Sequence, residues 1–407
     1  MKILIVSQYF WPESFLINDF SRKLVENGHE VVVATGKPNY PDGEIFSGYE
    51  RSGVQVESYL DKIEVVRVPL RPRGKGGALN LALNYLSFVA SGVWYLPRLL
   101  RGRDFDFILV FAVSPITQAI PAILLKWIKG AHLAVWVQDL WPESLSATGF
   151  VKKGVALKLV GKVVRIIYSC CNTVLIQSRA FFEPVKAYTS ASKIIYFPNS
   201  IDPESITGVG GAIPLELSRE LEGCFGVVFA GNVGSAQAIE TIVDAAALLQ
   251  DCKEIKIFVV GSGSMSGWLK AQKELLGLSN LVIPGRFAME SMPHIFKASS
   301  ALLVSLKDQK IFSSTIPSKV QAYLAAGRPI VASLDGEGAR VVTESGAGVV
   351  CPPEDARSLA GCIRNLYNMT PEDRESMGVS GRRYFEENFD MNNQVERLIE
   401  ILASRTG

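Results

Sequence analysis

The sequence predicts an α/β fold built from two doubly wound parallel sheets, one in each half of the chain. Short, continuous apolar runs such as residues 2–6 and 225–230 are typical of strands that helices bury on both faces. Segments with helical spacing follow most of these runs, and the alternation repeats through the 407 residues. A chain of this length is expected to form two or three domains.

The first half alternates strands and helices from its first residues. The run KILIVSQYF predicts a strand, FLINDFSRKLVENG predicts a helix that ends at Gly28, and HEVVVAT predicts a second strand. A further helix is predicted around 116–129. Four later apolar runs predict strands at 105–113, 132–138, 173–178 and 194–198.

The second half repeats this alternation after an interruption. Residues 203–222 are rich in Pro, Gly and Glu, which predicts a domain boundary. Beyond it, apolar runs predict strands at 225–231, 255–261, 281–285, 301–306, 329–334 and 348–351. Helices are predicted between them at 236–250, 267–277, 290–299 and 317–326. We therefore expect domains at 1–203 and 204–388, and a last helix within 389–407 that can pack on either one.

Composition excludes several classes of protein. Six cysteines without a C-x-x-C pair and three separated histidines indicate neither a disulfide framework nor a zinc site, and a reduced, cytoplasmic protein fits best. The apolar run at residues 1–6 is too short for a signal peptide. Residues 1–200 carry a net charge of +8 (23 Lys and Arg, 15 Asp and Glu), against −6 for residues 201–407 (19 and 25). No nucleic-acid-binding motif accompanies the basic half, so nucleic acid is not an expected partner.

The segment AGNVGSAQAIETI, residues 230–242, has the features of a phosphate-binding loop. Ligands of open parallel sheets bind at the carboxyl ends of the strands. Here Gly231 and Gly234 allow a tight turn after a strand, and Ser235 is predicted to cap a helix that begins near 236. A helix N-terminus reached through such a loop binds anions. The alternative is an ordinary strand–helix turn.

The segment STIPSKVQAYLAAGRPIVAS, residues 314–333, adds a cation at the same edge. Pro317 suits a first helical turn, and Ser314, Thr315 and Ser318 are candidate caps. Lys319 lies within that turn, where the helix dipole disfavours a cation unless an anion is bound. In IPGRFAMESM, Arg286 is a candidate for a diphosphate, and the backbone near Phe287 for a base. For both cations the alternative is a solvated surface side chain.

A short repeat, Trp-Pro-Glu-Ser, follows two strands of the first sheet. It places Glu13 and Glu143 at the ligand edge, and Asp139 precedes the second copy. Carboxylates there can orient or deprotonate hydroxyl groups. The alternative is helix capping, for which Ser and Glu near helix starts are common.

Two further patterns are rejected as sites. The pair Asp104 and Asp106 resembles a metal-binding D-x-D, but it begins a strand and so lies at the wrong end of the sheet. The glycines of 261–263 imitate a dinucleotide loop but lack the third glycine, and no acid ends the following strand. An NAD-dependent oxidoreductase is therefore the least favoured enzyme class.

Two segments favour a membrane surface as partner. Residues 78–97 are uncharged and apolar except for a narrow stripe of Asn80, Asn84, Ser87 and Ser91, and basic residues flank them. Residues 151–169 interleave Lys and Arg with aliphatic side chains. Apolar surface rimmed by cations suits an anionic bilayer. The alternative is a buried helix at 78–97, and a true span is disfavoured because strands of one domain flank it.

Six segments together resemble the family 4 retaining glycosyltransferases of the GT-B fold, over nearly the whole chain. Within that family they are similar to WbuB-type transferases of O-antigen assembly, which are linked to N-acetyl-L-fucosamine. The segments are SQYFWPES, GHEVVVATGKPNYP, VQDLWPES, FPNSID, AGNVGSAQAIETI and PSKVQAYLAAGRPIVAS. The resemblance implies two Rossmann-like domains facing a central cleft, with the acceptor in 1–203 and the donor in 204–388.

The resemblance also implies roles for particular residues. Asp139 takes the place of the family's catalytic His or Asp, with Glu13 and Glu143 facing the acceptor. The donor contacts that it implies, with their neighbours in the same motifs, are Gly231, Asn232, Gly234, Ser235, Gln237, Arg286, Phe287, Thr315, Ser318 and Lys319, and Glu337 of the next loop could reach toward the donor. It implies no cofactor and no required metal.

The sequence departs from the family at its charged positions. Asn232 and Gln237 stand where many relatives have Arg and Lys, and Ser314 and Ala322 stand where many have two glutamates. Lys319 and Arg286 are the cations left to hold a diphosphate.

The expected function is transfer of a sugar, N-acetyl-L-fucosamine or a similar 6-deoxy-amino sugar, from UDP to a polyprenyl-diphosphate-linked saccharide. Retention of configuration and a location on the cytoplasmic membrane face are expected with it. Two alternatives stay open: a UDP-sugar 2-epimerase of the same fold, and a non-catalytic scaffold that binds nucleotide sugars. The oligomeric state is not predicted.

Overall fold

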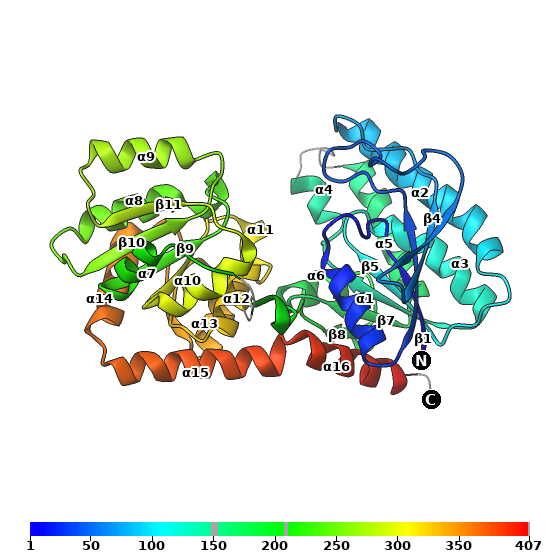
Figure 1. Ribbon diagram of the computed structural model, residues 1–407. Helices are drawn as coiled ribbons and strands as arrows, with labels where there is room; N and C mark the ends of the chain where they lie inside the picture. Colours follow the sequence, from blue (N-terminus) through cyan, green and yellow to red (C-terminus); the bar gives the residue numbers. More distant parts are fainter. Residues whose placement is uncertain (148–153, 207–210, 406–407) are drawn as a thin grey trace. The chain divides into compact units, whose positions relative to one another are not determined.

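The computed structural model describes residues 1–147, 154–206 and 211–405, which form two compact units (Figure 1). The first unit contains Met1–Asn199 and the residues from Gln394 onward, and the second contains Ser200–Asn393. Each unit is built around one predominantly parallel sheet covered by helices, which confirms the predicted fold class.

The first unit has an eight-stranded sheet in the order β3-β4-β2-β1-β5-β6-β7-β8. Neighbouring strands are parallel except β3 and β4, which form an antiparallel hairpin at the edge that the sequence reading did not include. The strands are β1 (Lys2–Val6), β2 (Glu30–Gly36), β3 (Gln55–Tyr59), β4 (Ile63–Val68), β5 (Phe107–Ala112), β6 (His132–Val137), β7 (Thr173–Ile176) and β8 (Ile194–Tyr196).

Helices cover both faces of this sheet. On one face, α2 (Ala78–Leu99), α3 (Ala119–Lys129) and α5 (Val155–Cys170) share a core with alternate residues of the strands. On the other, α1 (Leu16–Glu26) places the ring of Phe20 5.2 Å from that of Trp136 on β6. The remaining helices of the unit are α4 (Glu143–Ala147), α6 (Phe182–Lys186) and α16 (Met391–Ala403).

The second unit has six parallel strands in the order β11-β10-β9-β12-β13-β14. The chain winds outward from β9 in one direction and then from β12 in the other, so the ends of β9 and β12 mark the position where doubly wound sheets bind ligands. The strands are β9 (Phe225–Ala230), β10 (Ile255–Val260), β11 (Leu281–Gly285), β12 (Ala301–Ser305), β13 (Ile330–Ser333) and β14 (Gly348–Cys351).

Two separate helix layers bury the faces of this sheet. One layer is α8 (Ile239–Leu248), α9 (Ser266–Leu275) and α14 (Ala356–Asn368). The other is α7 (Leu215–Glu222), α10 (Met292–Ala298), α12 (Ser318–Ala326), α13 (Gly336–Glu344) and α15 (Pro371–Asn388). The helix α7 lies within 203–222, where the composition predicts a domain boundary and no helix. Its Leu217 and Leu221, four residues apart, are both buried.

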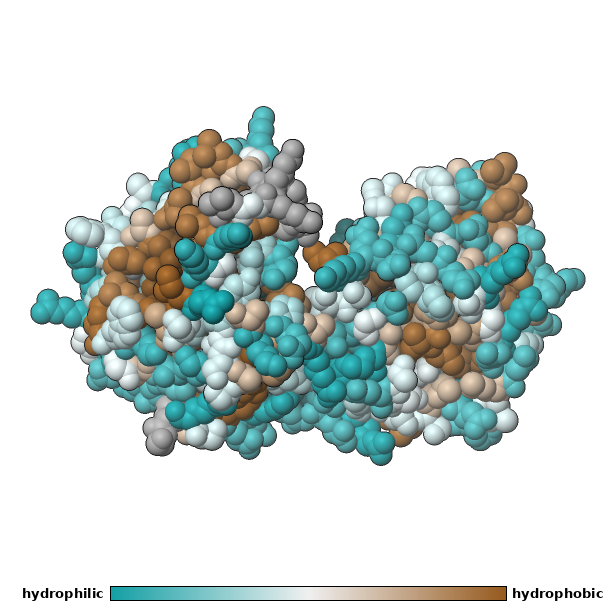
Figure 2. All heavy atoms as spheres, turned by 180° about the vertical axis from the view of Figure 1, so that it is seen from behind, coloured by the Kyte–Doolittle hydropathy of each residue, from teal (hydrophilic) through white to brown (hydrophobic). Residues whose placement is uncertain are grey.

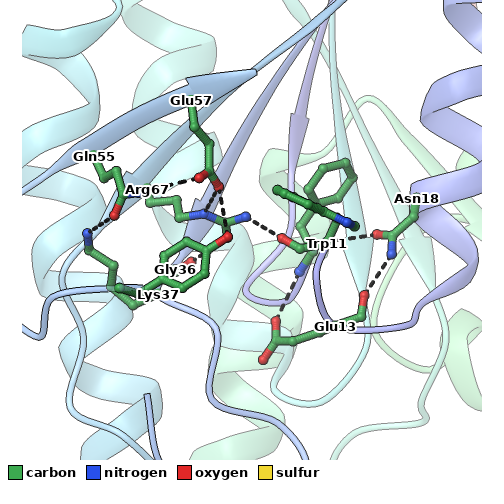
Figure 3. Close-up of polar contacts among 10 residues, drawn as sticks. Trp11, Glu13, Asn18, Gly36, Lys37, Gln55, Glu57 and Arg67 are labelled. Carbon is green, nitrogen blue, oxygen red and sulfur yellow. Dashed lines mark hydrogen bonds and ion pairs between the residues drawn. The ribbon is translucent and has the colours of Figure 1, made fainter. Parts of the chain in front are cut away.

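One buried arginine fastens the loops of the first unit to its edge hairpin (Figure 3). Arg67 of β4 has no exposed surface, and its guanidinium forms an ion pair with Glu57 of β3. It also donates to the carbonyl oxygens of Gly36, at 3.1 Å, and Trp11. The chain after β1 and the end of β2 are therefore held by one fully desolvated cation.

We expect Arg67→Met to lower the free energy of unfolding of the first unit by about 2–4 kcal/mol, because the half-buried carboxylate of Glu57 and the carbonyl oxygens of Gly36 and Trp11 lose their shared donor. The control is Arg103→Gln, which breaks the partly exposed pair with Glu64 at 2.9 Å and should cost less than about 1 kcal/mol. Urea unfolding followed by tryptophan fluorescence measures both. Equal midpoints for the two variants would contradict the structural role of Arg67.

Candidate active site

The loops after β9, β10 and β11 meet at the carboxyl edge of the second sheet. The backbone N–H of Gly231 donates to Val260 at 2.9 Å, and that of Gly261 donates to Gly285 at 2.8 Å. Gly231 has a φ of +131°, which side-chain-bearing residues rarely adopt. A Cβ at this position would lie 2.6 Å from Cε of Lys319. The structure therefore brings together the glycine loop and the lysine that the sequence placed in two separate motifs.

Lys319 carries a buried ammonium group without a counter-charge among the described residues. Its Nζ is shut off from solvent and has no hydrogen-bond partner in that part of the chain, although other atoms of the residue are partly exposed. The nearest favourable contact is with the ring of Phe229, whose centroid lies 3.7 Å from Nζ. Burial lowers the pKa of Lys319 to about 8. Such a cation is stabilised when an anion enters beside it.

The other residues of the glycine loop are arranged differently from the prediction. A 3₁₀ turn spans Ser235–Gln237, and α8 begins only at Ile239, after Ala238 with a φ of +45°. The expected cap by Ser235 is therefore wrong, and the hydroxyl is at the surface. The side chain of Asn232 lies next to Gly234 and donates to Gln237 at 3.4 Å.

The first turn of α12 also lacks the expected caps. The residue before the helix is Pro317, and no side chain caps the free N–H groups. Ser314 donates instead to the carbonyl of Lys310 at 2.9 Å, Thr315 is half-buried and Ser318 is exposed. The uncapped N–H groups beside Lys319 are left for another acceptor.

Three further candidates lie around this edge. Arg286 is exposed after β11, two strands from β9 and so roughly 10 Å away across the sheet. Phe287 is half-buried against the core. Glu337 is buried at the start of α13, where its carboxylate pairs with Arg340 at 2.9 Å.

A large cavity of the second unit lies away from this edge. Its volume is about 1270 Å³, and it opens at the amino ends of β12 and β13, beside Ser300 and Pro329. Because ligands of doubly wound sheets bind at the carboxyl ends, we do not assign the donor to it. Within the described ranges, no cluster of three or more His, Cys, Asp or Glu residues could hold a metal ion.

In the first unit, Asp139 lies at the carboxyl edge between β5 and β6. Its Oδ2 accepts hydrogen bonds from the backbone N–H of Ser114, at 3.1 Å, and from the hydroxyl, at 2.6 Å. The indole of Trp141 donates to the same hydroxyl at 3.0 Å. The second Trp-Pro-Glu-Ser copy is thereby tied to the loop after β5, with a half-buried carboxylate at the edge.

The two repeat glutamates have different environments. Glu13 is 2% exposed, and its carboxylate accepts hydrogen bonds from the backbone N–H groups of Phe10, Asn39 and Tyr40. Burial raises the pKa of Glu13 to about 7 against the effect of these three donors. The contacts favour a loop-positioning role over a catalytic one. Glu143 is exposed at the first position of α4.

The polar stripe of α2 lies on the inward side of the helix, together with the buried Phe88 and Leu96. Asn84 is buried and donates to the carbonyl of Arg71 at 2.6 Å, and the hydroxyl of Ser87 accepts from the backbone N–H of Arg71 at 2.8 Å. Large apolar side chains of this helix and its neighbours are exposed: Leu79, Leu86, Val93 and Trp94 of α2, Trp127 and Ile128 of α3, and Leu159 and Ile166 of α5. Figure 2 shows apolar side chains gathered on the surface of the first unit. No helix among the described residues is both long and apolar enough to cross a bilayer.

Sequence reasoning missed one group of side chains at the edge of the first sheet. The rings of Tyr9, Phe15 and Tyr40 lie within 5.8 Å of one another, with the guanidinium of Arg73 over two of them. The sequence did hold a signal, since Tyr9 lies near the end of one predicted strand and Tyr40 follows the end of another.

Comparisons with known proteins agree with this fold. Residues 224–369 match the family model described as glycosyl transferases group 1, and residues 17–200 match that of the glycosyl transferase 4-like domain. Among solved structures, sucrose-phosphate synthase of Thermosynechococcus elongatus superimposes with a TM-score of 0.71 at 15% identity, covering 99% of this chain and 98% of that one. The Anabaena protein HepE in complex with UDP gives a TM-score of 0.68 at 16% identity, covering 99% and 100%.

These two doubly wound units and their structural neighbours define the GT-B fold. Since the two family models together match most of the chain, the protein belongs to the family 4 glycosyltransferases. One relative is WcaI of Escherichia coli K12, a glycosyl transferase whose name assigns it to colanic acid biosynthesis. It is 25% identical over 419 residues, which covers 98% of this chain and 99% of WcaI.

We expect Lys319→Met to stabilise the ligand-free protein, because it removes a desolvated cation. With a folded pKa of about 8 against 10.5 when unfolded, the unfolded chain binds more protons between these values, so stability rises with pH across that window. Lys319→Met should raise the free energy of unfolding at pH 7 by roughly 1–3 kcal/mol and flatten this rise.

The control for this prediction is Lys270→Met, at an exposed lysine of α9. Urea unfolding of both variants and the unaltered protein at pH 7 and pH 9.5 provides the comparison. A Lys319→Met protein that is less stable at pH 7, with an unchanged pH slope, would show that Lys319 is already compensated.

Proposed function

We propose that this protein transfers a sugar from a UDP-sugar to a polyprenyl-diphosphate-linked saccharide, with retention of configuration, in the assembly of a bacterial surface polysaccharide. The observation that carries the proposal is the partnerless cation of Lys319 against Gly231. The UDP bound to HepE supports a UDP-sugar as donor, and the name of WcaI supports a role in the assembly of a surface polysaccharide. The precise donor sugar, N-acetyl-L-fucosamine, rests on the resemblance to WbuB-type transferases.

The proposed chemistry depends on stabilising a leaving diphosphate. The bond between the anomeric carbon and the diphosphate oxygen breaks, and the oxygen keeps the electron pair. Lys319, the uncapped N–H groups of α12 and the glycine loop stabilise that charge in a partly desolvated site. The acceptor hydroxyl bonds to the same face of the carbon, and its proton passes to the departing diphosphate. No metal ion or cofactor takes part in this scheme.

Residues of the first unit are proposed to hold the acceptor. Asp139, fixed by two hydrogen bonds from Ser114, is placed to accept a hydrogen bond from a sugar hydroxyl. Glu13 would stabilise this edge by accepting hydrogen bonds from the backbone N–H groups of residues 39 and 40. The exposed Glu143 would contact the acceptor.

The transfer test incubates the protein with UDP-sugars, including UDP-N-acetyl-L-fucosamine, and a lipid-linked acceptor. We expect a glycolipid of increased mass and release of UDP, both unaffected by EDTA. Lys319→Met should weaken UDP binding roughly 10–100-fold, as loss of a charge-assisted hydrogen bond does, whereas Lys270→Met should not. Epimer formation without an acceptor would instead identify a UDP-sugar 2-epimerase, and UDP binding without turnover of any donor would identify a scaffold.

We also propose that the outward apolar surface of α2, α3 and α5 rests on the cytoplasmic face of an anionic membrane. The three helices contain no Asp or Glu. The exposed face of α5 carries Lys158, Lys162 and Arg165 beside Leu159 and Ile166. Apolar side chains in the headgroup layer and cations at anionic lipids supply the two contributions that surface binding needs.

Replacing both Trp94 and Trp127 with Ser should therefore weaken binding to vesicles that contain anionic lipid by at least about tenfold, since two large apolar side chains leave the membrane. Trp268→Ser is the matched control, because this tryptophan is exposed on the second unit. Sedimentation with phosphatidylglycerol vesicles measures the binding. Equal binding of the double variant and the control would show that the surface of α2 and α3 does not contact the membrane.

A further inference from the structure

The group of aromatic rings in the first unit forms a site at the ends of neighbouring strands. Tyr9 and Phe15 follow β1, Tyr40 follows β2, and Arg73 follows β4. The ring of Tyr9 stacks on Phe15 with centroids 5.4 Å apart, and Tyr40 lies 5.4 Å from Phe15. The guanidinium carbon of Arg73 lies 5.1 Å from the ring centre of Tyr40 and 5.9 Å from that of Tyr9. We call these four residues the aromatic–arginine site.

Arg73 is held in place by its backbone and not by its charge. Its N–H donates to the side-chain oxygen of Asn39 at 3.1 Å, and the N–H of Gly74 donates to Gly43 at 2.7 Å. Gly43 has a φ of +82°, and a Cβ there would lie 1.9 Å from the carbonyl oxygen of Gly74. The backbone of residues 73 and 74 therefore packs directly against residues 39 and 43. This packing fixes the position from which the side chain of Arg73 extends.

The guanidinium of Arg73 has no anionic partner in the described part of the chain. It forms neither an ion pair nor a hydrogen bond there, whereas the guanidinium of Arg67 is fully engaged. Two charged groups face the site from nearby elements. Glu13 is buried and satisfied by three backbone N–H groups, and Asp139 is bound by Ser114. Five N–H donors on a half-buried planar cation are thus left for a ligand.

The surroundings of Arg73 indicate what kind of anion fits. Five residues further along, the chain enters α2, whose first turn exposes Ala78 and Leu79. Tyr85 of the same helix is half-buried and lies within electrostatic range of Arg73 and Asp139: burial raises its pKa, Arg73 lowers it and Asp139 raises it. A ligand that spans this region would have an apolar tail along α2, an anionic centre at Arg73 and a hydroxyl-bearing part toward Asp139.

We infer that Arg73, framed by Tyr9, Phe15 and Tyr40, binds the diphosphate of the lipid-linked acceptor. A guanidinium matches phosphate oxygens in a bidentate way, and aromatic faces accommodate the apolar faces of a sugar. The polyprenyl chain would then leave toward the exposed surface of α2. This inference deepens the proposed function and rests on it for the identity of the acceptor, but the contacts that carry it lie within the first unit alone.

The test uses flotation with neutral phosphatidylcholine vesicles that contain either undecaprenyl diphosphate or undecaprenol. We expect the protein to prefer the diphosphate vesicles, and Arg73→Gln to lose this preference by at least tenfold. Arg51→Gln, at an exposed arginine of the same unit, is the control and should keep it. Arg73→Lys, which keeps the charge but not the bidentate geometry, should lose only part of it.

Further arms separate this inference from the other proposals. Binding of UDP should be unchanged in Arg73→Gln, because it does not use the aromatic–arginine site. Excess UDP should not displace the protein from the diphosphate vesicles. If Arg73→Gln keeps the preference, or if UDP competes with the lipid, the inference is overturned. Failure of sugar transfer with an intact preference would overturn the proposed function alone.

Discussion

The site of the second unit depends on a cation that folding leaves without a partner. Placing the Nζ of Lys319 against Gly231 and over the ring of Phe229 removes it from water and gives it no acceptor among the residues that the structure describes. Folding therefore carries an electrostatic cost that a bound diphosphate relieves. The glycine is required because a Cβ would occupy the space of the lysine stem. Stability and ligand binding are coupled through this one contact.

In the first unit, by contrast, two buried charged side chains have partners. Arg67 and Glu13 are both fully engaged, the arginine by Glu57 and two carbonyl groups, the glutamate by three backbone N–H groups. These contacts fix the chain after β1 and β2, where the aromatic–arginine site is formed. These contacts hold the backbone around Arg73 rigid while its guanidinium stays available for a ligand. Such an arrangement preorganises a binding site.

The sequence was enough to predict most strands of both sheets, because parallel strands buried on both faces read as continuous apolar runs, but it did not predict the edge hairpin of β3 and β4. It also predicted that Gly231 and Lys319 would share one edge, since both follow strands. It did not predict the delayed start of α8 or the lack of a cap by Ser235, because a 3₁₀ turn and a left-handed Ala238 have no pattern of their own. Arg67 and Arg73 look alike as surface arginines, and only tertiary packing separates a structural cation from a binding one.

The central claim is that Lys319 is the partner of the donor diphosphate, and proton uptake on UDP binding tests it most directly. Calorimetric titration of UDP in buffers of different ionisation enthalpy gives the number of protons taken up. With a pKa of about 8 in the free protein, raised by the diphosphate, we expect roughly half a proton per UDP at pH 8 and none for Lys319→Met. Binding of UDP without proton uptake, or with the same uptake in the variant, would contradict the account.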